Sequence, residues 1–96
     1  MRNRGKWYNK NMSDASVTVK IYSTTWCAYC RMAMEYLTKL GVSFKEINVE
    51  QDPSAMAYIM SKTHSAGVPQ IEIGDQVILG FDRPRIDQAL RGNKLI

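Results

Sequence analysis

The fold is decided by the stretch Tyr22-Ser23-Thr24-Thr25-Trp26-Cys27-Ala28-Tyr29-Cys30, which holds both cysteines of the 96-residue chain. Before the cysteines, residues 17–22 alternate branched and polar side chains, as is typical of a strand. After them, residues 28–40 contain good helix formers and no Gly or Pro, and Gly41 suits the position just past a helix end. The cysteines are therefore expected where a strand gives way to a helix.

A cysteine pair at the start of a helix is suited to thiol–disulfide exchange. Free backbone amides and the helix dipole stabilise a thiolate there, so Cys27 is expected to have a lowered pKa and to be the attacking sulfur. Cys30 lies about one helical turn further on, where it can attack Cys27 and resolve a mixed disulfide. The pair is interpreted as a redox-active dithiol, with Cys27 and Cys30 as the catalytic residues.

Two other interpretations of the pair stay open at this stage. A structural zinc site needs four ligands, and His64 is the one histidine available beyond the two cysteines. Two packed cysteines without redox chemistry would suit Cys30, but Cys27 beside Trp26 at a helix end is a poor core position. The spacing favours redox chemistry over both, and no metal site is expected.

Length and composition indicate one ordinary globular domain. The chain is 45% hydrophobic and 23% charged, and no apolar run is long enough for a membrane helix. No secretory signal is visible, so the chain is expected in the cytoplasm, where structural disulfides are rare. We expect it to act as a monomer.

The net charge of +4 comes from the beginning of the chain. Arg2, Arg4, Lys6 and Lys10 supply four positive charges, whereas the rest of the sequence holds nine Lys or Arg against nine Asp or Glu. Residues 1–15 are predicted to be a basic extension, either disordered or an artefact of an upstream start codon, and residues 16–96 the folded domain. Because that domain is neutral, no nucleic-acid or membrane partner is expected, although a short tethering arm stays open.

Alternating side chains predict three further strands, at residues 42–49, 68–73 and 76–79. Gly74-Asp75 between the last two is a tight turn, which makes them an antiparallel hairpin. The first two strands are joined through a helix, and a right-handed crossover of this kind makes them parallel. The result is a four-stranded mixed sheet.

Two further helices are predicted by their starting residues. Asp52-Pro53 begins one that fades near Thr63, and Asp82 caps another over residues 83–90, with Gly92 just past its end. The apolar stripe of the middle helix comprises Met56, Ile59 and Met60, and that of the first helix Cys30, Ala33, Met34, Leu37 and Leu40. The element order is βαβαββα, an α/β domain with three helices flanking the sheet.

Residues 22–30, followed some forty residues later by Gly67-Val68-Pro69, resemble the glutaredoxin branch of the thioredoxin fold. The resemblance covers roughly residues 17–90, and the βαβαββα order agrees with it. Thioredoxins proper carry an extra strand and helix before their cysteines, for which there is no room after Met12. The resemblance implies a cis peptide bond before Pro69 that faces the cysteines. It also implies a Val68 backbone that pairs with an extended substrate or with glutathione.

The same resemblance implies a substrate or glutathione groove. The groove would be formed by Thr24, Trp26, Tyr29, Val68, Pro69, Gly80, Phe81 and Asp82. Three positions depart from the usual glutaredoxin pattern: Thr24 stands in place of a lysine, Gly67 in place of a threonine, and Gly80-Phe81-Asp82 in place of a Gly-Gly-x-Asp turn. Lys62 or His64 could supply a positive partner for a carboxylate instead.

The electron donor stays open on these residues. Residues 80–84, Gly-Phe-Asp-Arg-Pro, look more like redoxins that serve ribonucleotide reductase and take electrons from thioredoxin reductase. Phe81 would then be apolar docking surface. Tyr29, by contrast, is typical of glutaredoxins and of mycoredoxins, which use mycothiol. Ala28 in place of the common Pro allows a third class, a carrier that bridges a [2Fe–2S] cluster with glutathione.

Taken together, the residues and the resemblance predict a thiol–disulfide oxidoreductase. It would reduce protein disulfides or glutathione mixed disulfides through its dithiol, with no bound cofactor. The expected partners are disulfide-containing proteins, together with glutathione, another low-molecular-weight thiol, or thioredoxin reductase.

Overall fold

The computed structural model describes residues 17–96, so the predicted extension at residues 1–15 lies outside the described part. Along the chain the elements are β2 (Val19–Ser23), α2 (Ala28–Lys39), β3 (Lys45–Asn48), α3 (Pro53–Thr63), β4 (Gln70–Ile73), β5 (Gln76–Leu79) and α4 (Arg83–Gly92). The four strands form one sheet in the order β3-β2-β4-β5. β2 and β3 are parallel, while β4 is antiparallel to both β2 and β5. The predicted βαβαββα order and mixed sheet are confirmed.

The sheet register brings four chain segments to one end of the molecule. Tyr22 of β2 is opposite Gln70 of β4, and Gln70 is in turn opposite Leu79 of β5. On the other side of β2, Ser23 is level with Asn48 of β3. The segments that follow β2, β3 and β5 and the segment that precedes β4 therefore meet at the same end of the sheet.

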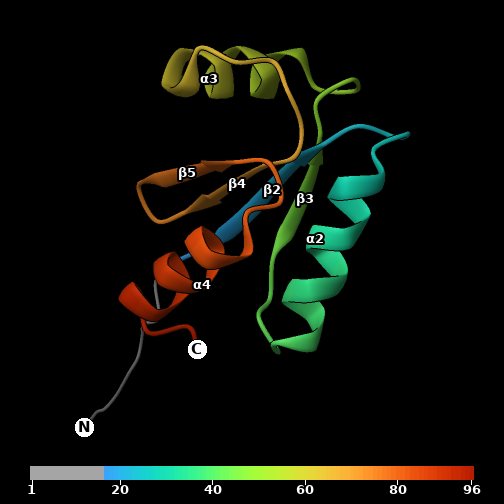
Figure 1. The fold of residues 1–96 in the computed structure, drawn as a ribbon. Helices are drawn as coiled ribbons and strands as arrows, with labels where there is room; N and C mark the ends of the chain where they lie inside the picture. The colour runs from blue at the N-terminus through green and yellow to red at the C-terminus, as the bar shows by residue number, and fades with distance from the viewer. Residues whose placement is uncertain (1–16) are drawn as a thin grey trace, which may run out of the picture.

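The two faces of the sheet are covered by different helices (Figure 1): α2 and α4 lie on one side and α3 on the other. The core on the α2 and α4 side is large, with Val19, Ile21, Ala33, Leu37, Val42, Ile71, Ile73, Ile78, Ile86, Ala89 and Leu90 buried. The core on the α3 side is small and comprises buried Tyr22, Val49 and Ile59, with partly buried neighbours such as Met56 and Val68. Each face of the sheet is therefore covered by at least one helix, as an α/β layer arrangement requires.

Three strands are shorter than the alternation predicts. β2 begins at Val19 because its ladder with β4 starts there, opposite Ile73. β3 begins at Lys45 rather than at residue 42. The Val42 N–H donates to the Leu37 carbonyl, so Val42 belongs to the turn that ends α2. β4 begins at Gln70, because the preceding proline has no N–H to give to a ladder.

The helix starts are as predicted, but some details at the helix ends are not. Asp52 and Asp82 both act as N-caps, accepting from the amides of Ala55 and Arg85. Gly92, predicted to lie past the last helix, is its final residue; Asn93 ends the helix, and its side chain donates to the Ala89 carbonyl at 2.8 Å.

Two side chains assigned to buried stripes are exposed. Leu40 is 36% exposed because it is the C-cap of α2, where the chain leaves the helix at Gly41 with φ 75°. Met60 is 42% exposed, since α3 touches the sheet along a narrow line through Met56 and Ile59, and the next residue is rotated away from it.

Candidate active site

The two cysteines lie at the start of α2, as the sequence predicts. Cys27 is the N-cap, with extended backbone angles of φ −92° and ψ 105°, and its Sγ accepts a hydrogen bond from the Cys30 amide at 3.0 Å. The two residues form a disulfide with their Cα atoms 5.2 Å apart. Cys27 is half-buried, whereas Cys30 is 1% exposed. One sulfur can therefore meet a partner while the other is sheltered.

The turn that leads to Cys27 is tied to the segment after β3. The Thr25 amide donates to Glu50 Oε1 at 3.1 Å, and the Asn48 side-chain amide donates to the Thr25 hydroxyl at 3.1 Å. Asn48 Oδ1 in turn accepts from the Glu50 amide at 2.9 Å. Within the turn, the Cys27 amide donates a hydrogen bond to the Thr24 carbonyl at 3.4 Å, and Thr24 is half-buried.

Sequence reasoning did not single out Asn48 or Glu50. No local motif marks them, and they are about twenty residues from the cysteines in the sequence. The usable signal is topological: the carboxyl ends of neighbouring parallel strands lie together, so residues at the end of β3 reach the end of β2.

The peptide bond between Val68 and Pro69 is cis, as the family resemblance implies. Pro69 is buried, and its carbonyl accepts from the Gly80 amide at 2.8 Å. Because Tyr22 is opposite Gln70, the cis bond lies beside the end of β2, where the turn to the cysteines begins. Val68 lies between α3 and β4, and within residues 17–96 neither its N–H nor its carbonyl forms a hydrogen bond. Both groups can therefore pair with a partner.

Gly80, Phe81 and Asp82 form the turn from β5 into α4 at the same end of the sheet. Gly80 has φ 80°, the left-handed region that favours glycine. Phe81 is half-buried and packs edge-on against Tyr36 of α2, with ring centroids 5.9 Å apart. Asp82 accepts from the Arg85 amide at 3.3 Å and pairs with its guanidinium Nε at 3.5 Å. The Asp82 side chain is thus engaged as a cap.

The exposed apolar surface next to Cys27 comes from its immediate neighbours. Trp26 is 88% exposed and Tyr29 is 63% exposed. The ring of Phe81, which was expected to be docking surface, is partly covered by its contact with Tyr36. Trp26 and Tyr29 therefore provide more open apolar surface for a partner than Phe81 does.

Lys62 and His64, the two side chains considered as partners for a substrate carboxylate, have different surroundings. Lys62 Nζ lies 3.7 Å from Glu72 Oε2 and 5.5 Å from the Tyr58 ring centroid, and the Tyr58 hydroxyl beside it raises the pKa of Lys62. His64 is exposed and ends α3 in a left-handed conformation with φ 59°. Lys62 is therefore already paired within the chain.

Within residues 17–96, no three His, Cys, Asp or Glu side chains are grouped as a metal site would need. No helix there is long and apolar enough to cross a membrane.

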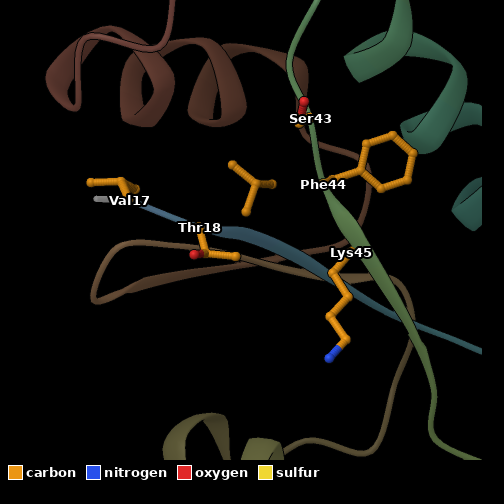
Figure 2. A pocket seen from close by; sticks show the side chains of 6 residues that line it. Val17, Thr18, Ser43, Phe44 and Lys45 are labelled. Carbon is orange, nitrogen blue, oxygen red and sulfur yellow. The ribbon is translucent and has the colours of Figure 1, made fainter. Parts of the chain in front are cut away.

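A cavity of about 310 Å³ lies at the end of the sheet opposite the cysteines, and Figure 2 shows side chains that line it. Its lining comprises Val17, Thr18, Val19, Ser43, Phe44 and Lys45, at and before the starts of β2 and β3. None of the predicted site residues lines it.

These features together define a thioredoxin-like domain with a dithiol redox centre at one end of its sheet. The sequence matches the Glutaredoxin family over residues 19–78. The chain belongs to the glutaredoxin family, whose members are generally thiol–disulfide oxidoreductases.

Sequence relatives cover most of the domain. The chain is 42% identical over 64 residues to a glutaredoxin of Pseudomonas aeruginosa, and the aligned region covers 67% of this chain and 76% of that protein. It is 35% identical over 72 residues to a glutaredoxin-like 8.6 kDa protein in the rubredoxin operon of Clostridium pasteurianum, spanning 75% of this chain and 96% of that protein.

Solved structures show the same fold. The glutaredoxin of Archaeoglobus fulgidus superposes with a TM-score of 0.72 at 25% identity, covering 81% of this chain and 90% of that one. The glutaredoxin-like NrdH-redoxin of Escherichia coli superposes with a TM-score of 0.66 at 25% identity, covering 74% and 92%.

Proposed function

We propose that the chain reduces protein disulfides and glutathione mixed disulfides through a dithiol mechanism. The observation that carries the proposal is the asymmetry of the pair: Cys27 is half-buried at the tip of α2 and Cys30 is 1% exposed behind it. We place the reaction in the cytosol, where thiol reductants are present.

The reaction proceeds in two exchange steps. The Cys27 thiolate attacks one sulfur of the substrate disulfide; that S–S bond breaks, and the other substrate sulfur leaves as a thiolate. Cys30 then loses its proton and attacks Cys27 Sγ, which releases the second substrate sulfur and forms the Cys27–Cys30 disulfide. Two electrons pass from the chain to the substrate, and an external thiol or reductase returns them.

Three parts of the site support this mechanism. The Cys30 amide donates to Cys27 Sγ at 3.0 Å, a contact that favours the thiolate. The Val68 main chain, which makes no hydrogen bond within residues 17–96, offers a donor and an acceptor to an extended segment of the substrate. Trp26 and Tyr29 add open apolar surface beside the attacking sulfur.

A second candidate is electron supply from thioredoxin reductase rather than glutathione. Thr24 stands in place of the usual Lys, and Lys62 is paired with Glu72, so two candidate cations for a glutathione carboxylate are missing or engaged. The NrdH-redoxin of Escherichia coli is described as a glutaredoxin-like protein with a thioredoxin-like activity profile, and it shares this fold.

A coupled NADPH assay separates the two donors. One arm supplies glutathione and glutathione reductase, and the other thioredoxin reductase alone, with the same disulfide substrate in both. Cys27→Ser is expected to lose turnover in either arm. Cys30→Ser should trap the mixed disulfide, or keep the removal of glutathione alone if glutathione is the donor. Full activity of Cys27→Ser would overturn the assignment of the nucleophile.

A further inference from the structure

Gln70 is a buried polar residue that the disulfide-exchange steps do not use. It is the first residue of β4, directly after the cis proline, and is 0% exposed. A buried carboxamide has to be hydrogen-bonded to be tolerated, so its partners indicate what it does.

The partners of the Gln70 side chain lie at the end of α3 and in the loop that leads from it to the cis bond. Nε2 donates to the carbonyl of Ser65 at 2.9 Å and to that of Gly67 at 2.9 Å. Oε1 accepts a hydrogen bond from the hydroxyl of Thr63 at 2.9 Å, and Thr63 is the last residue of α3. Since carbonyls can only accept, the amide orientation is fixed by these neighbours.

This arrangement fixes the conformation on both sides of Val68. The carbonyl before it, on Gly67, is held by Gln70, and the carbonyl of Pro69 is held by the Gly80 amide at 2.8 Å. The loop is closed further by the Ser65 hydroxyl, which accepts from the Gly67 amide at 3.1 Å. Between two held neighbours, the Val68 N–H and C=O point in a set direction.

We propose that Gln70 is a positioning residue for substrate binding, which holds the loop so that the Val68 main chain is ready to pair with an extended disulfide-containing peptide. The proposal rests on the proposed function and adds a determinant of substrate class to it. A segment already held in its binding conformation loses less entropy on binding. The effect should be larger for a disulfide with a peptide main chain than for a small one without it.

The test compares two disulfides reduced by the same prereduced chain. One is a disulfide-bonded peptide such as insulin, whose main chain can pair with that of Val68. The other is 2-hydroxyethyl disulfide, which has no peptide main chain. Single-turnover rates without added thiol are followed by tryptophan fluorescence. Gln70→Met removes the carboxamide at similar length, and Gln76→Met makes the same change at an exposed site on β5.

Gln70→Met is expected to lower the ratio of the peptide rate constant to the small-disulfide rate constant by about tenfold, mainly through weaker apparent binding of the peptide. Gln76→Met should keep the wild-type ratio. Thr63→Val should lower the ratio in the same direction, and Thr63→Ser, which keeps the hydroxyl, should restore it. These two variants carry the test if Gln70→Met folds poorly.

A ratio that stays at the wild-type value in both Gln70→Met and Thr63→Val would overturn the positioning role. Failure of the proposed function gives a different result, because the wild-type chain would then reduce neither disulfide. A wild-type chain that reduces both, with an unchanged ratio in the variants, leaves the dithiol mechanism intact and removes Gln70 from substrate recognition.

Discussion

The two faces of the sheet are held to their helices by different means. On the α2 and α4 side, the strands contribute Ile21, Ile71 and Ile73, and the buried residues that pack against them are apolar. On the α3 side, the same strands contribute Tyr22, Gln70 and Glu72, all buried. All four residues of β4 are buried although they alternate polar and apolar. One face is packed by hydrophobic burial and the other is tied by hydrogen bonds as well.

Glu72 is the centre of the polar face. Its Oε1 accepts from the Tyr22 hydroxyl at 2.8 Å, and its Oε2 accepts from the Tyr58 hydroxyl at 2.6 Å and lies 3.7 Å from Lys62 Nζ. Tyr58 and Lys62 belong to α3, so the carboxylate links this helix to the sheet. A buried charge is tolerated when it has such partners. The difference between the faces predicts that α3 and its loop depend on polar contacts, and α2 on packing.

The largest effect on stability should come from the apolar face. Leu37 is 0% exposed in the large core, so Leu37→Ala should lower the free energy of unfolding by about 2–5 kcal/mol. Urea unfolding of the oxidised chain measures this loss. Leu40→Ala, at a residue 36% exposed on the same segment, is the matched control and should change stability much less. Equal losses at both positions would contradict the apolar account of this face.

A smaller effect is expected from the polar face, and it should be local. Glu72→Leu leaves the Tyr22 hydroxyl buried without its acceptor, which should cost about 1–3 kcal/mol. Amide hydrogen exchange should accelerate more in α3 than in α2, because Tyr58 and Lys62 lose their partner on the sheet. Glu35→Leu, at an exposed position of α2, is the control. Uniform acceleration in both helices would show that Glu72 does not serve α3 in particular.

The smallest effect is a pH dependence at Tyr22. Burial of its hydroxyl, followed by the hydrogen bond to Glu72, raises the pKa of Tyr22 well above the ordinary value of 10.0. The folded chain therefore keeps this proton when the unfolded chain loses it. The stability that results is complete below the ordinary pKa and is lost as pH rises beyond it.

Tyr22→Phe tests this dependence directly. The wild-type chain should lose stability more steeply than the variant between about pH 9 and about pH 11, as measured by urea unfolding at each pH. Parallel losses in the two proteins would mean that another group controls the alkaline behaviour.

Local patterns were sufficient to predict the elements and the position of the two cysteines. The strand-to-helix change around Cys27 is where the sequence predicts it, and Asp52 and Asp82 marked two helix starts. The cis bond at Pro69 followed from the family resemblance and is present. The helix starts and the position of the cysteines depend on residues close in sequence, whereas the cis bond needed the resemblance of two distant segments.

What the sequence did not reveal depends on contacts between distant segments. Gln70 and Glu72 occupy alternate positions of a short strand, a pattern that normally indicates a solvent-facing side. They are buried because α3 covers that side, which is a property of the tertiary arrangement. Asn48 and Glu50 were missed for the same reason, since they reach Thr25 across the sheet.

The Cys27 sulfur is both the group that carries electrons and the atom that closes the first turn of α2. The helix end and the redox state are therefore thermodynamically linked: whatever frays that turn changes how readily the sulfur is oxidised, and each change in the sulfur alters the helix end. A partner that clamps the start of α2 could tune the driving force of the reaction without touching either cysteine.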